Sequence, residues 1–475
     1  MGKNSALRKP LAKKVETPLT VSRSVISTRW TPLRRVLASL VGIGIVTHFL
    51  GLAHPDQVVF DEVHMGKFVS AYCGTAQRIF DIHPPHGKLL IALGAKLGGY
   101  DGKFSFEKIG QPYGNTPTLF LRLVPAISGI LIPPLFALLL AYLGASLPTV
   151  FLGGLALALE NAILVETRLL LFDGILLAST LGALVCLLKA NRERGWRFYF
   201  TSAMGGAAAG LAIGTKFTGL AVCGLMALFI VVKILKHKSR SYTFLRLRQA
   251  GVIFSSAALV YLLGWMIHFS LLTKPGPADA FHPTTGVFWT DLVKVHETML
   301  SANYNLNKKH PDGSSAWTWP IMKVAPFYWV GDGATIYLLG NPVIWWGGSI
   351  LFFGILLILL ISRQTHLKLD PPPHYSVTLW LPLVGYVMSY LPLFGVQRVL
   401  FLYHYLTPLI FSLATVLLWM DQAGWIRSNN LREQRKSYYV VIGLMVAGFL
   451  FVAPLSYGLP GSLNSSLTQM VRSWR

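Results

Sequence analysis

Charged residues are scarce in this chain of 475 residues. Asp, Glu, Lys and Arg together make up 13% of it, whereas an ordinary soluble domain carries about 25%. Hydrophobic residues make up 53%, and the mean hydropathy is +0.53. This composition excludes an ordinary soluble globular protein and indicates that lipid is the solvent for much of the chain.

Cysteine is rarer still. Cys73, Cys186 and Cys223 lie far apart, and the last two fall within apolar runs, so neither a disulfide framework nor the spacing of a metal site is present. Five of the 13 histidines also show no HExxH-like spacing: His54, His64, His282, His296 and His310. We therefore expect no metal site and no tightly bound cofactor, and a need for a divalent cation stays open.

Acidic residues are few as well, 19 against 42 basic ones, which gives a net charge of +23. A nucleic-acid binder would concentrate such charge on one face with stacking aromatics, but here it gathers in loops between apolar runs, so nucleic acid is not an expected partner. The basic residues before the first apolar run are too many for the start of a cleaved signal peptide: Lys3, Arg8, Lys9, Lys13, Lys14, Arg23, Arg29, Arg34 and Arg35. We expect an uncleaved, cytoplasmic N-terminus.

Long apolar runs are abundant, and several approach the roughly 20 residues that cross a bilayer. Hydropathy predicts about eleven spans, at 36–52, 119–143, 148–165, 169–189, 198–214, 217–235, 249–272, 342–362, 376–394, 399–419 and 437–456. Alternating their sides places the short basic loops together with the N-terminus, as the positive-inside rule requires. Within the closely spaced pairs, Gly205, Gly206 and Gly210 either break a span or let helices pack closely.

The opposite side of the membrane receives the two longest segments between spans. We divide the chain into a basic cytoplasmic segment, 1–35, and a membrane domain, 36–475, which contains a first outer loop at 53–118, a long outer loop at 273–341 and C-terminal spans at 342–475. In the first loop, HPPHGKLLIALGAKL places apolar residues at helical spacing after two prolines. This pattern predicts an amphipathic helix along the membrane surface.

The string FDEVHMGKF places Asp61 and Glu62 side by side just beyond the first span. Neighbouring carboxylates near a low-dielectric boundary raise each other's pKa, which suits a general base or a cation site. An isolated Asp-Glu pair is more often a solvated loop edge, and the spacing does not decide between the two.

Four cations recur at the outer ends of spans: Arg122, Arg168, Lys216 and Arg398. Each one alone is explained equally well by a side chain that snorkels to the interface. Their shared side, together with His83, Lys88 and His404, favours a cavity that binds an anion. Arg168 and Asp173 are also expected to pair with each other or with Glu166 as a structural network.

Seven strings, in this order along the chain, carry a resemblance to a known family. They are FDEVHMGKF, DIHPPHGKLLIALGA, LRLVPAISGILIPPL, LALENAILVETRLLLFDGILL, GLAIGTKFTGL, LLGNPVIWW and FLYHYLTPLIF. On this ordered set the chain resembles the protein O-mannosyltransferases of the GT-C glycosyltransferase superfamily. The resemblance implies an all-α polytopic membrane fold with a cytoplasmic N-terminus, in which 36–475 is the catalytic domain.

The chain departs from the family pattern at two places. Eukaryotic members insert a β-trefoil MIR domain in the long outer loop, and 273–341 is too short to hold one, so the chain resembles the compact prokaryotic members. Glu160 stands where an Asp is expected in the LDN-like string.

The resemblance implies transfer of mannose from a polyprenyl- or dolichyl-phosphate donor to Ser or Thr hydroxyls of translocated polypeptides, with inversion. It implies a multi-pass protein of the plasma membrane with its active site on the outer face, and the translocation machinery is a further candidate partner. By the same resemblance Asp61 is the base, Glu62 organises the site, and Arg122, Lys216 and Arg398 bind the donor phosphate. The residues expected to shape the site are His83, Lys88, Arg168, Asp173, Tyr403 and His404.

Two other functions remain open at this point. A GT-C enzyme of the same architecture transfers a different sugar, such as an aminoarabinose or another hexose, to a lipid or glycan acceptor. A transporter of lipid-linked sugars is the third candidate, but transporters often carry inverted repeats and ionisable residues near the membrane midplane. This sequence shows no internal repeat.

Overall fold

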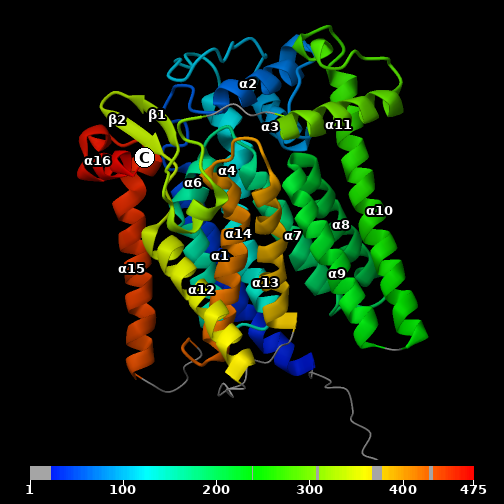
Figure 1. The fold of residues 1–475 in the computed structure, drawn as a ribbon, viewed down its shortest axis with the longest axis vertical. Coiled ribbons are helices and arrows are strands. Elements are labelled where there is room, and N and C mark those ends of the chain that lie inside the picture. The colour runs from blue at the N-terminus through cyan, green and yellow to red at the C-terminus, as the bar shows by residue number, and fades with distance from the viewer. Residues whose placement is uncertain (1–22, 238, 306–309, 366–376, 427–431, 475) are drawn as a thin grey trace, which may run out of the picture.

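A computed structural model describes residues 23–237, 239–305, 310–365, 377–426 and 432–474. The predicted basic residues Lys3, Arg8, Lys9, Lys13 and Lys14 lie outside this part of the chain. Long helices run side by side through the molecule, and shorter elements gather at one end (Figure 1).

The helices of the central bundle overlap the predicted apolar ranges. They are α1 (Arg23–Phe49), α4 (Thr118–Tyr142), α5 (Leu147–Ala158), α6 (Asn161–Arg168), α7 (Asp173–Ala190), α8 (Trp196–Thr215), α9 (Leu220–Lys236), α10 (Arg240–Leu271), α12 (Pro342–Thr365), α13 (Val377–Tyr390), α14 (Leu406–Gln422) and α15 (Arg432–Tyr457). Within the described residues, seven helices are long and apolar enough to cross a membrane, or up to eight with one bent pair. The polytopic all-α architecture is confirmed, and the number of eleven spans stays a prediction.

The predicted span at 148–165 is the bent pair α5 and α6, which meet at 54°. Glu160 begins α6 as its N-cap, because its carboxylate accepts a hydrogen bond from the Ala162 backbone N–H at 3.1 Å. A capping side chain satisfies a backbone donor that has no partner inside the helix. The chain therefore turns here without leaving that polar group unpaired in the core.

Inside a bilayer no hydrophobic driving force acts between helices, so their association depends on close van der Waals packing. Gly206 of α8 packs on α10, and a Cβ there would lie 2.1 Å from the Ile253 carbonyl oxygen. Gly210 meets the Ala257 carbonyl oxygen in the same way at 2.4 Å. These glycines therefore let α8 and α10 pack closely, and α8 continues unbroken through them.

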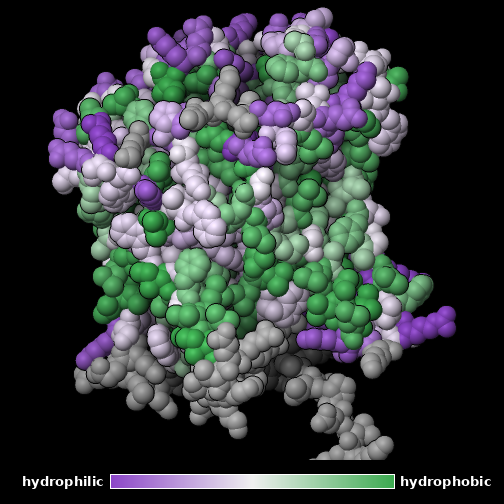
Figure 2. Space-filling model, in the orientation of Figure 1, coloured by the Kyte–Doolittle hydropathy of each residue, from purple (hydrophilic) through white to green (hydrophobic). Residues whose placement is uncertain are grey.

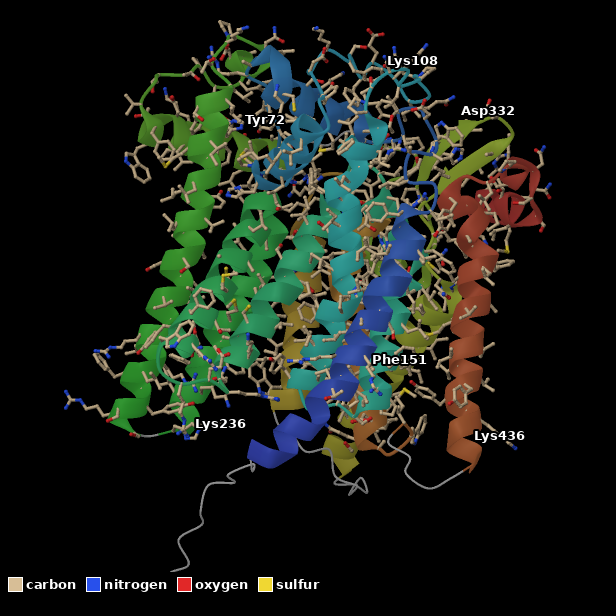
Figure 3. The ribbon with its side chains drawn as sticks, turned by 180° about the vertical axis from the view of Figure 1, so that it is seen from behind. Tyr72, Lys108, Phe151, Lys236, Asp332 and Lys436 are labelled. Carbon is tan, nitrogen blue, oxygen red and sulfur yellow. The ribbon has the colours of Figure 1, made fainter. Side chains whose placement is uncertain are left out.

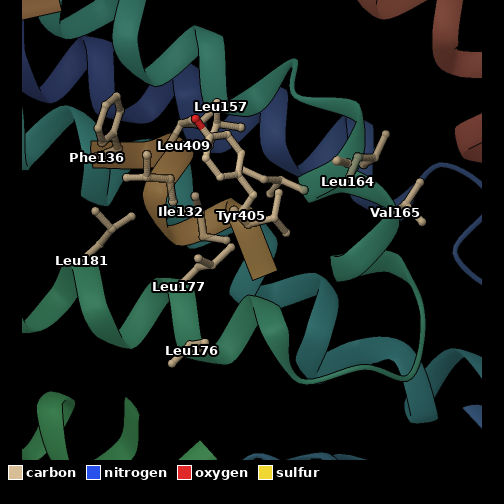
Figure 4. Close-up of a cluster of buried hydrophobic side chains, with 14 of the residues drawn as sticks. Ile132, Phe136, Leu157, Leu164, Val165, Leu176, Leu177, Leu181, Tyr405 and Leu409 are labelled. Carbon is tan, nitrogen blue, oxygen red and sulfur yellow. The ribbon is translucent and has the colours of Figure 1, made fainter. Parts of the chain in front are cut away.

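The centre of the molecule is a packed aliphatic core. Figure 4 shows Ile132 and Phe136 of α4, Leu157 of α5, Leu177 of α7 and Leu409 of α14 pointing toward one another. On the visible face hydrophobic side chains cover the middle of the molecule, and hydrophilic ones crowd the end that carries the shorter elements (Figure 2). This distribution is that of a protein that spans a bilayer.

We call the end with the shorter elements the loop end. It carries α2 (Glu62–Ser70), α3 (His86–Leu97), α11 (Phe288–Asn305), α16 (Ser466–Ser473) and an antiparallel hairpin of β1 (Phe327–Gly331) and β2 (Ala334–Tyr337). The hairpin was not expected from the sequence. We call the opposite end the basic end, where Lys236 and Lys436 lie (Figure 3). The helix predicted in the first loop is α3, and its position on a membrane surface stays a prediction.

Candidate active site

Asp61 lies at the loop end, immediately before α2. The residue before it, Phe60, has a left-handed backbone with φ of 43°, a conformation that a bulky residue keeps only when its surroundings enforce it. The hairpin does so, because the Phe60 N–H donates to the Tyr328 carbonyl oxygen at 3.0 Å and the two rings stack at 4.0 Å. Asp61 is thus anchored from β1.

The Asp61 carboxylate has no hydrogen-bond or ion-pair partner among the described side chains. Desolvation raises its pKa, as do the nearby carboxylates of Asp173 and Asp81, while the charges of His64 and Lys216 lower it. A half-buried carboxylate with free oxygens and a raised pKa has the properties of a general base.

Glu62, the next residue, differs from Asp61 because hydrogen-bond donors surround its carboxylate. It is fully buried, and Arg122 binds it through two hydrogen bonds, Nε to Oε1 at 2.8 Å and Nη2 to Oε2 at 3.0 Å. The Tyr113 hydroxyl and the Leu170 backbone N–H also donate to it, at 3.0 and 2.9 Å. Glu62 is therefore a structural ion that ties α2 to α4 and to the turn after α6.

The other N–H groups of Arg122 donate hydrogen bonds to backbone carbonyl oxygens at the start of the first loop. Its Nη1 donates to the Leu52 and Pro55 carbonyl oxygens at 3.3 and 3.0 Å, and its Nη2 to that of Gln57 at 3.2 Å. The side chain is fully buried. Its assignment to the donor phosphate stays a prediction, and this geometry favours a positioning role.

Lys216 and Asp173 form a buried ion pair. The Lys216 Nζ lies 2.7 and 2.8 Å from the two carboxylate oxygens, and it also lies 5.0 Å from the centre of the Phe172 ring and 4.9 Å from that of Tyr403. Lys216, Asp173 and Tyr403 line a narrow cavity together with His404 and Ser389. The predicted residues Lys216, Asp173, Tyr403 and His404 therefore come together.

Arg398 borders a wider groove of about 510 Å³ at the loop end. Its Nη2 lies 3.4 Å from the His404 Nε2, and its Nε is buried without a hydrogen-bond partner among the described residues. Ser314, Ser315 and His310 also line this groove. Arg398 thus has unused hydrogen-bonding capacity next to an open space.

His83 lies near both Lys216 and Arg398. Burial lowers its pKa, and the nearby charges of Lys216, Arg398, Lys88 and His404 lower it further. Lys216, Arg398, Lys88 and His404 therefore all lie near His83. We call the cations Lys216 and Arg398, together with the imidazoles of His83 and His404, the cationic cluster.

Lys88 lies at the edge of this cluster and is bound to the loop. Its Nζ forms an ion pair with Asp81 and donates to the His83 carbonyl oxygen at 2.7 Å. Desolvation lowers the Lys88 pKa, and Asp81 opposes that shift. Lys88 therefore fixes the turn that carries His83.

The expected pairing of Arg168 with Asp173 or Glu166 is wrong. Arg168 ends α6, and its Nη2 donates to the carbonyl oxygens of Leu50 and Gly51 at 2.7 and 2.6 Å, which follow α1. Its guanidinium lies 4.3 Å from the centre of the Tyr457 ring. The Arg168 side chain points toward the end of α1. Asp173 lies at the start of α7 and binds Lys216 instead.

Several residues at this site were missed by sequence reasoning. Tyr328 donates a hydrogen bond to Glu166, which is buried near Asp61 and Lys216, and Asp81 pairs with Lys88. Asp81 carried a usable signal, because only Ile82 separates it from the HPPHGK string. Tyr328 carried none, because its partner is 162 residues away.

The described residues contain no group of three or more His, Cys, Asp and Glu side chains arranged to hold a metal ion. Among the described residues, the site combines the unpaired carboxylate of Asp61 with the nearby cation of Lys216, and Arg398 lies in the same cationic cluster. Such an arrangement can accept a proton on one side and stabilise negative charge on the other.

Solved structures with the same fold define the class of protein. A chain of the Saccharomyces cerevisiae protein O-mannosyltransferase Pmt1-Pmt2 complex, bound to the sugar donor, matches with a TM-score of 0.82 at 19% identity, over 90% of each chain. ArnT from Cupriavidus metallidurans matches with a TM-score of 0.53 at 15% identity, over 92% of this chain and 69% of that one. The chain is a polytopic membrane protein with the GT-C fold.

Sequence comparison narrows the class to one family. Residues 38–273 match the model "Dolichyl-phosphate-mannose-protein mannosyltransferase", and residues 288–474 match "C-terminal four TMM region of protein-O-mannosyltransferase". The chain belongs to the protein O-mannosyltransferase family. The predicted family is thereby confirmed.

Curated relatives are considerably longer than the matching region. Protein O-mannosyltransferase 1 of Drosophila melanogaster is 30% identical over 331 residues, 66% of this chain and 36% of the relative. Dolichyl-phosphate-mannose--protein mannosyltransferase 4 of Candida albicans is 33% identical over 255 residues, 50% of this chain and 33% of the relative. The chain thus spans about a third of the length of the curated relatives that it matches.

Proposed function

We propose that this protein transfers mannose from a polyprenyl- or dolichyl-phosphate-mannose donor to Ser or Thr hydroxyls of polypeptides, with inversion of the anomeric centre. The observation that carries the proposal is the Asp61 carboxylate, which has no partner among the described side chains and lies near the charge of Lys216 in the cationic cluster. The names of the relatives support the same reaction, and so does the sugar donor bound to the Saccharomyces cerevisiae complex.

In the proposed mechanism the acceptor hydroxyl gives its proton to the Asp61 carboxylate. The hydroxyl oxygen bonds to the anomeric carbon on the face opposite the phosphate, and the bond from that carbon to the phosphate oxygen breaks. The electron pair leaves with the lipid phosphate, whose added negative charge Lys216 and Arg398 stabilise. Because the leaving group is already a good anion, the step needs no protonating acid.

The buried pair of Glu62 and Arg122 holds this base in place. Glu62 follows Asp61 directly, and Arg122 joins it to the carbonyl oxygens of Leu52, Pro55 and Gln57. A base displaced by about 1 Å loses about 100-fold in rate. We assign both residues a positioning role, with Lys88 holding the turn of His83 in a similar way.

We also propose an orientation in which the basic end faces the cytoplasm and the loop end faces outward across the plasma membrane. Lys236 and Lys436 at the basic end support it through the positive-inside rule. In that orientation the site meets polypeptides as they emerge from translocation, with the divalent cation dependence open to test by chelation.

The proposal is tested with purified full-length protein, radiolabelled polyprenyl-phosphate mannose and a Ser/Thr peptide. We expect Asp61→Asn to reduce transfer by about 100-fold or more, the usual contribution of a positioned base. Asp101→Asn is the matched control, since Asp101 lies in the same loop in an exposed ion pair with Lys103. Undiminished transfer by Asp61→Asn would contradict the assignment, and mass spectrometry of the product identifies the sugar.

A further inference from the structure

Arg246 is a buried cation far from the candidate active site. It lies on α10, six residues after the helix begins at the basic end, or about 9 Å along the helix axis. Its side chain is 7% exposed. If α10 spans the membrane, as its length and apolar composition allow, this position lies near the headgroup region of the leaflet at that end.

The hydrogen-bond partners of Arg246 are neutral and incomplete. Its Nη1 donates to the Gln249 Oε1 at 2.7 Å, and the Gln249 Nε2 donates in turn to the Ser202 Oγ of α8 at 3.3 Å. Its Nε is buried and has no hydrogen-bond partner among the described residues. The guanidinium lies 4.8 Å from the centre of the Tyr242 ring and 5.9 Å from that of Phe198.

Other buried cations in the described part of the chain are compensated. Arg122, Lys88 and Lys216 each have a carboxylate partner, and Arg168 binds backbone carbonyls after α1. No ion pair is found for Arg246 among the described residues. A buried guanidinium without a counter-charge is costly, so an anion from outside the chain would stabilise it.

The surroundings of Arg246 are those of a membrane interface. Lys233 and Lys236 of α9 and the exposed Arg240 of α10 add positive charge. Exposed apolar side chains flank these cations on the faces of α8 and α10: Trp196, Phe200, Phe244, Leu245 and Leu247. Positive charge beside exposed apolar surface fits a ligand with an anionic head and a hydrocarbon tail.

We propose that α8, α9 and α10 form a binding site for an anionic phospholipid at the basic end, with its phosphate oxygens accepting from the Arg246 guanidinium. The flanking apolar side chains contact the acyl chains, which a free phosphate ion lacks. This site is separate from the proposed mannosyl transfer and stands on Arg246 and its neighbours alone.

The test uses delipidated full-length protein in detergent and native mass spectrometry. Phosphatidylglycerol, phosphatidylcholine and inorganic phosphate are added separately, and then phosphate is added in competition with phosphatidylglycerol. We expect retention of phosphatidylglycerol over phosphatidylcholine, and about tenfold weaker retention in Arg246→Gln, the effect of losing one charge-assisted hydrogen bond. Arg248→Gln, an exposed site on the same helix, is the matched control and keeps the selectivity.

Arg246→Lys keeps the charge, and we expect it to keep the preference for phosphatidylglycerol even where Arg246→Gln folds poorly. Equal retention of the two lipids by the unaltered chain would overturn the proposal. Equal retention of phosphatidylglycerol by Arg246→Gln and Arg248→Gln would do the same. Displacement of the lipid by inorganic phosphate would reassign the site to a free anion.

Discussion

At the scale of single residues, two adjacent carboxylates have different surroundings and different proposed roles. Glu62 is enclosed by Arg122, Tyr113 and backbone N–H groups, while Asp61 keeps its oxygens free. Successive residues at the start of a helix point in directions about 100° apart. Glu62 therefore enters the core, while Asp61 stays half-buried.

The Glu62–Arg122 pair leads to a prediction about stability. Arg122→Ala leaves the fully buried Glu62 carboxylate without its cation, and breaking such a pair costs about 3–5 kcal/mol. We expect a strongly lowered unfolding temperature in detergent, measured by intrinsic fluorescence. Lys103→Ala, which removes an exposed partner of Asp101, is the control and should change stability by less than about 1 kcal/mol. Similar unfolding temperatures for both variants would refute the structural role.

Asp61 also leads to a prediction about pH. A base acts when deprotonated, and because desolvation raises the Asp61 pKa, activity should fall on acidification at a pH above the ordinary Asp value of about 3.9. The charge of His64 opposes that shift. We therefore expect His64→Gln to raise the pKa and to move the acid limb of the kcat/KM profile to higher pH.

Lys67→Gln is the control for this profile, because Lys67 is exposed on the same helix. Its acid limb should stay closer to that of the unaltered protein. An acid limb that does not move in His64→Gln would argue against Asp61 as the titrating base.

At the scale of elements, the short hairpin of β1 and β2 positions the backbone next to Asp61. The string YWVGDGATIY carries an Asp-Gly pair between apolar positions, which is a strong hairpin signal. Asp332 and Gly333 both have positive φ, 51° and 72°, as the tight turn requires. Through Tyr328 the hairpin holds the backbone before Asp61.

The contact between α8 and α10 gives the prediction for this scale. Gly206→Ala places a Cβ 2.1 Å from the Ile253 carbonyl oxygen, and a backbone atom cannot move aside as a side chain can. We expect a loss of about 1–3 kcal/mol in stability, as for other overpacked sites, measured by thermal unfolding in detergent. Gly251→Ala on α10 meets no atom within 4 Å and is the matched control. Equal melting of the two variants would contradict this packing.

At the scale of the whole molecule, the two ends differ in chemistry. Carboxylates and cations are interleaved at the loop end, where they form the pairs Asp81–Lys88, Asp173–Lys216 and Glu62–Arg122. The basic end carries an excess of Lys and Arg. The proposed orientation rests on this difference, which also separates the candidate active site from the proposed phospholipid site.

The proposed orientation predicts the pattern of thiol labelling in intact cells. Lys108 is exposed at the loop end and Lys236 is exposed at the basic end (Figure 3). A membrane-impermeant maleimide should label Lys108→Cys in intact cells and Lys236→Cys after permeabilisation. The native cysteines are buried or half-buried, and the unaltered protein gives the background. Labelling of Lys236→Cys alone in intact cells would invert the orientation.

The sequence by itself determined the membrane class, the approximate helix ranges, the family and the gathering of ionisable residues between particular spans. These features are local, because a run of apolar residues or a string such as FDEVHMGKF is complete within a few turns of chain. The helices α5 and α6 were predicted as one continuous span, and the hairpin was not predicted. Glu160 and the Asp-Gly pair nevertheless mark these two positions in the sequence.

Only the tertiary structure decided which ionisable groups meet. Arg122 binds Glu62 from 60 residues away, Lys216 binds Asp173 from 43 residues away, and Arg168 binds the carbonyls after α1. Such pairings depend on how each helix is rotated and how deep it lies against its neighbours, and hydropathy reports neither quantity. Within the part of the chain that the structure describes, the same rotation leaves Asp61 without a partner near Lys216 and Arg246 without a counter-charge.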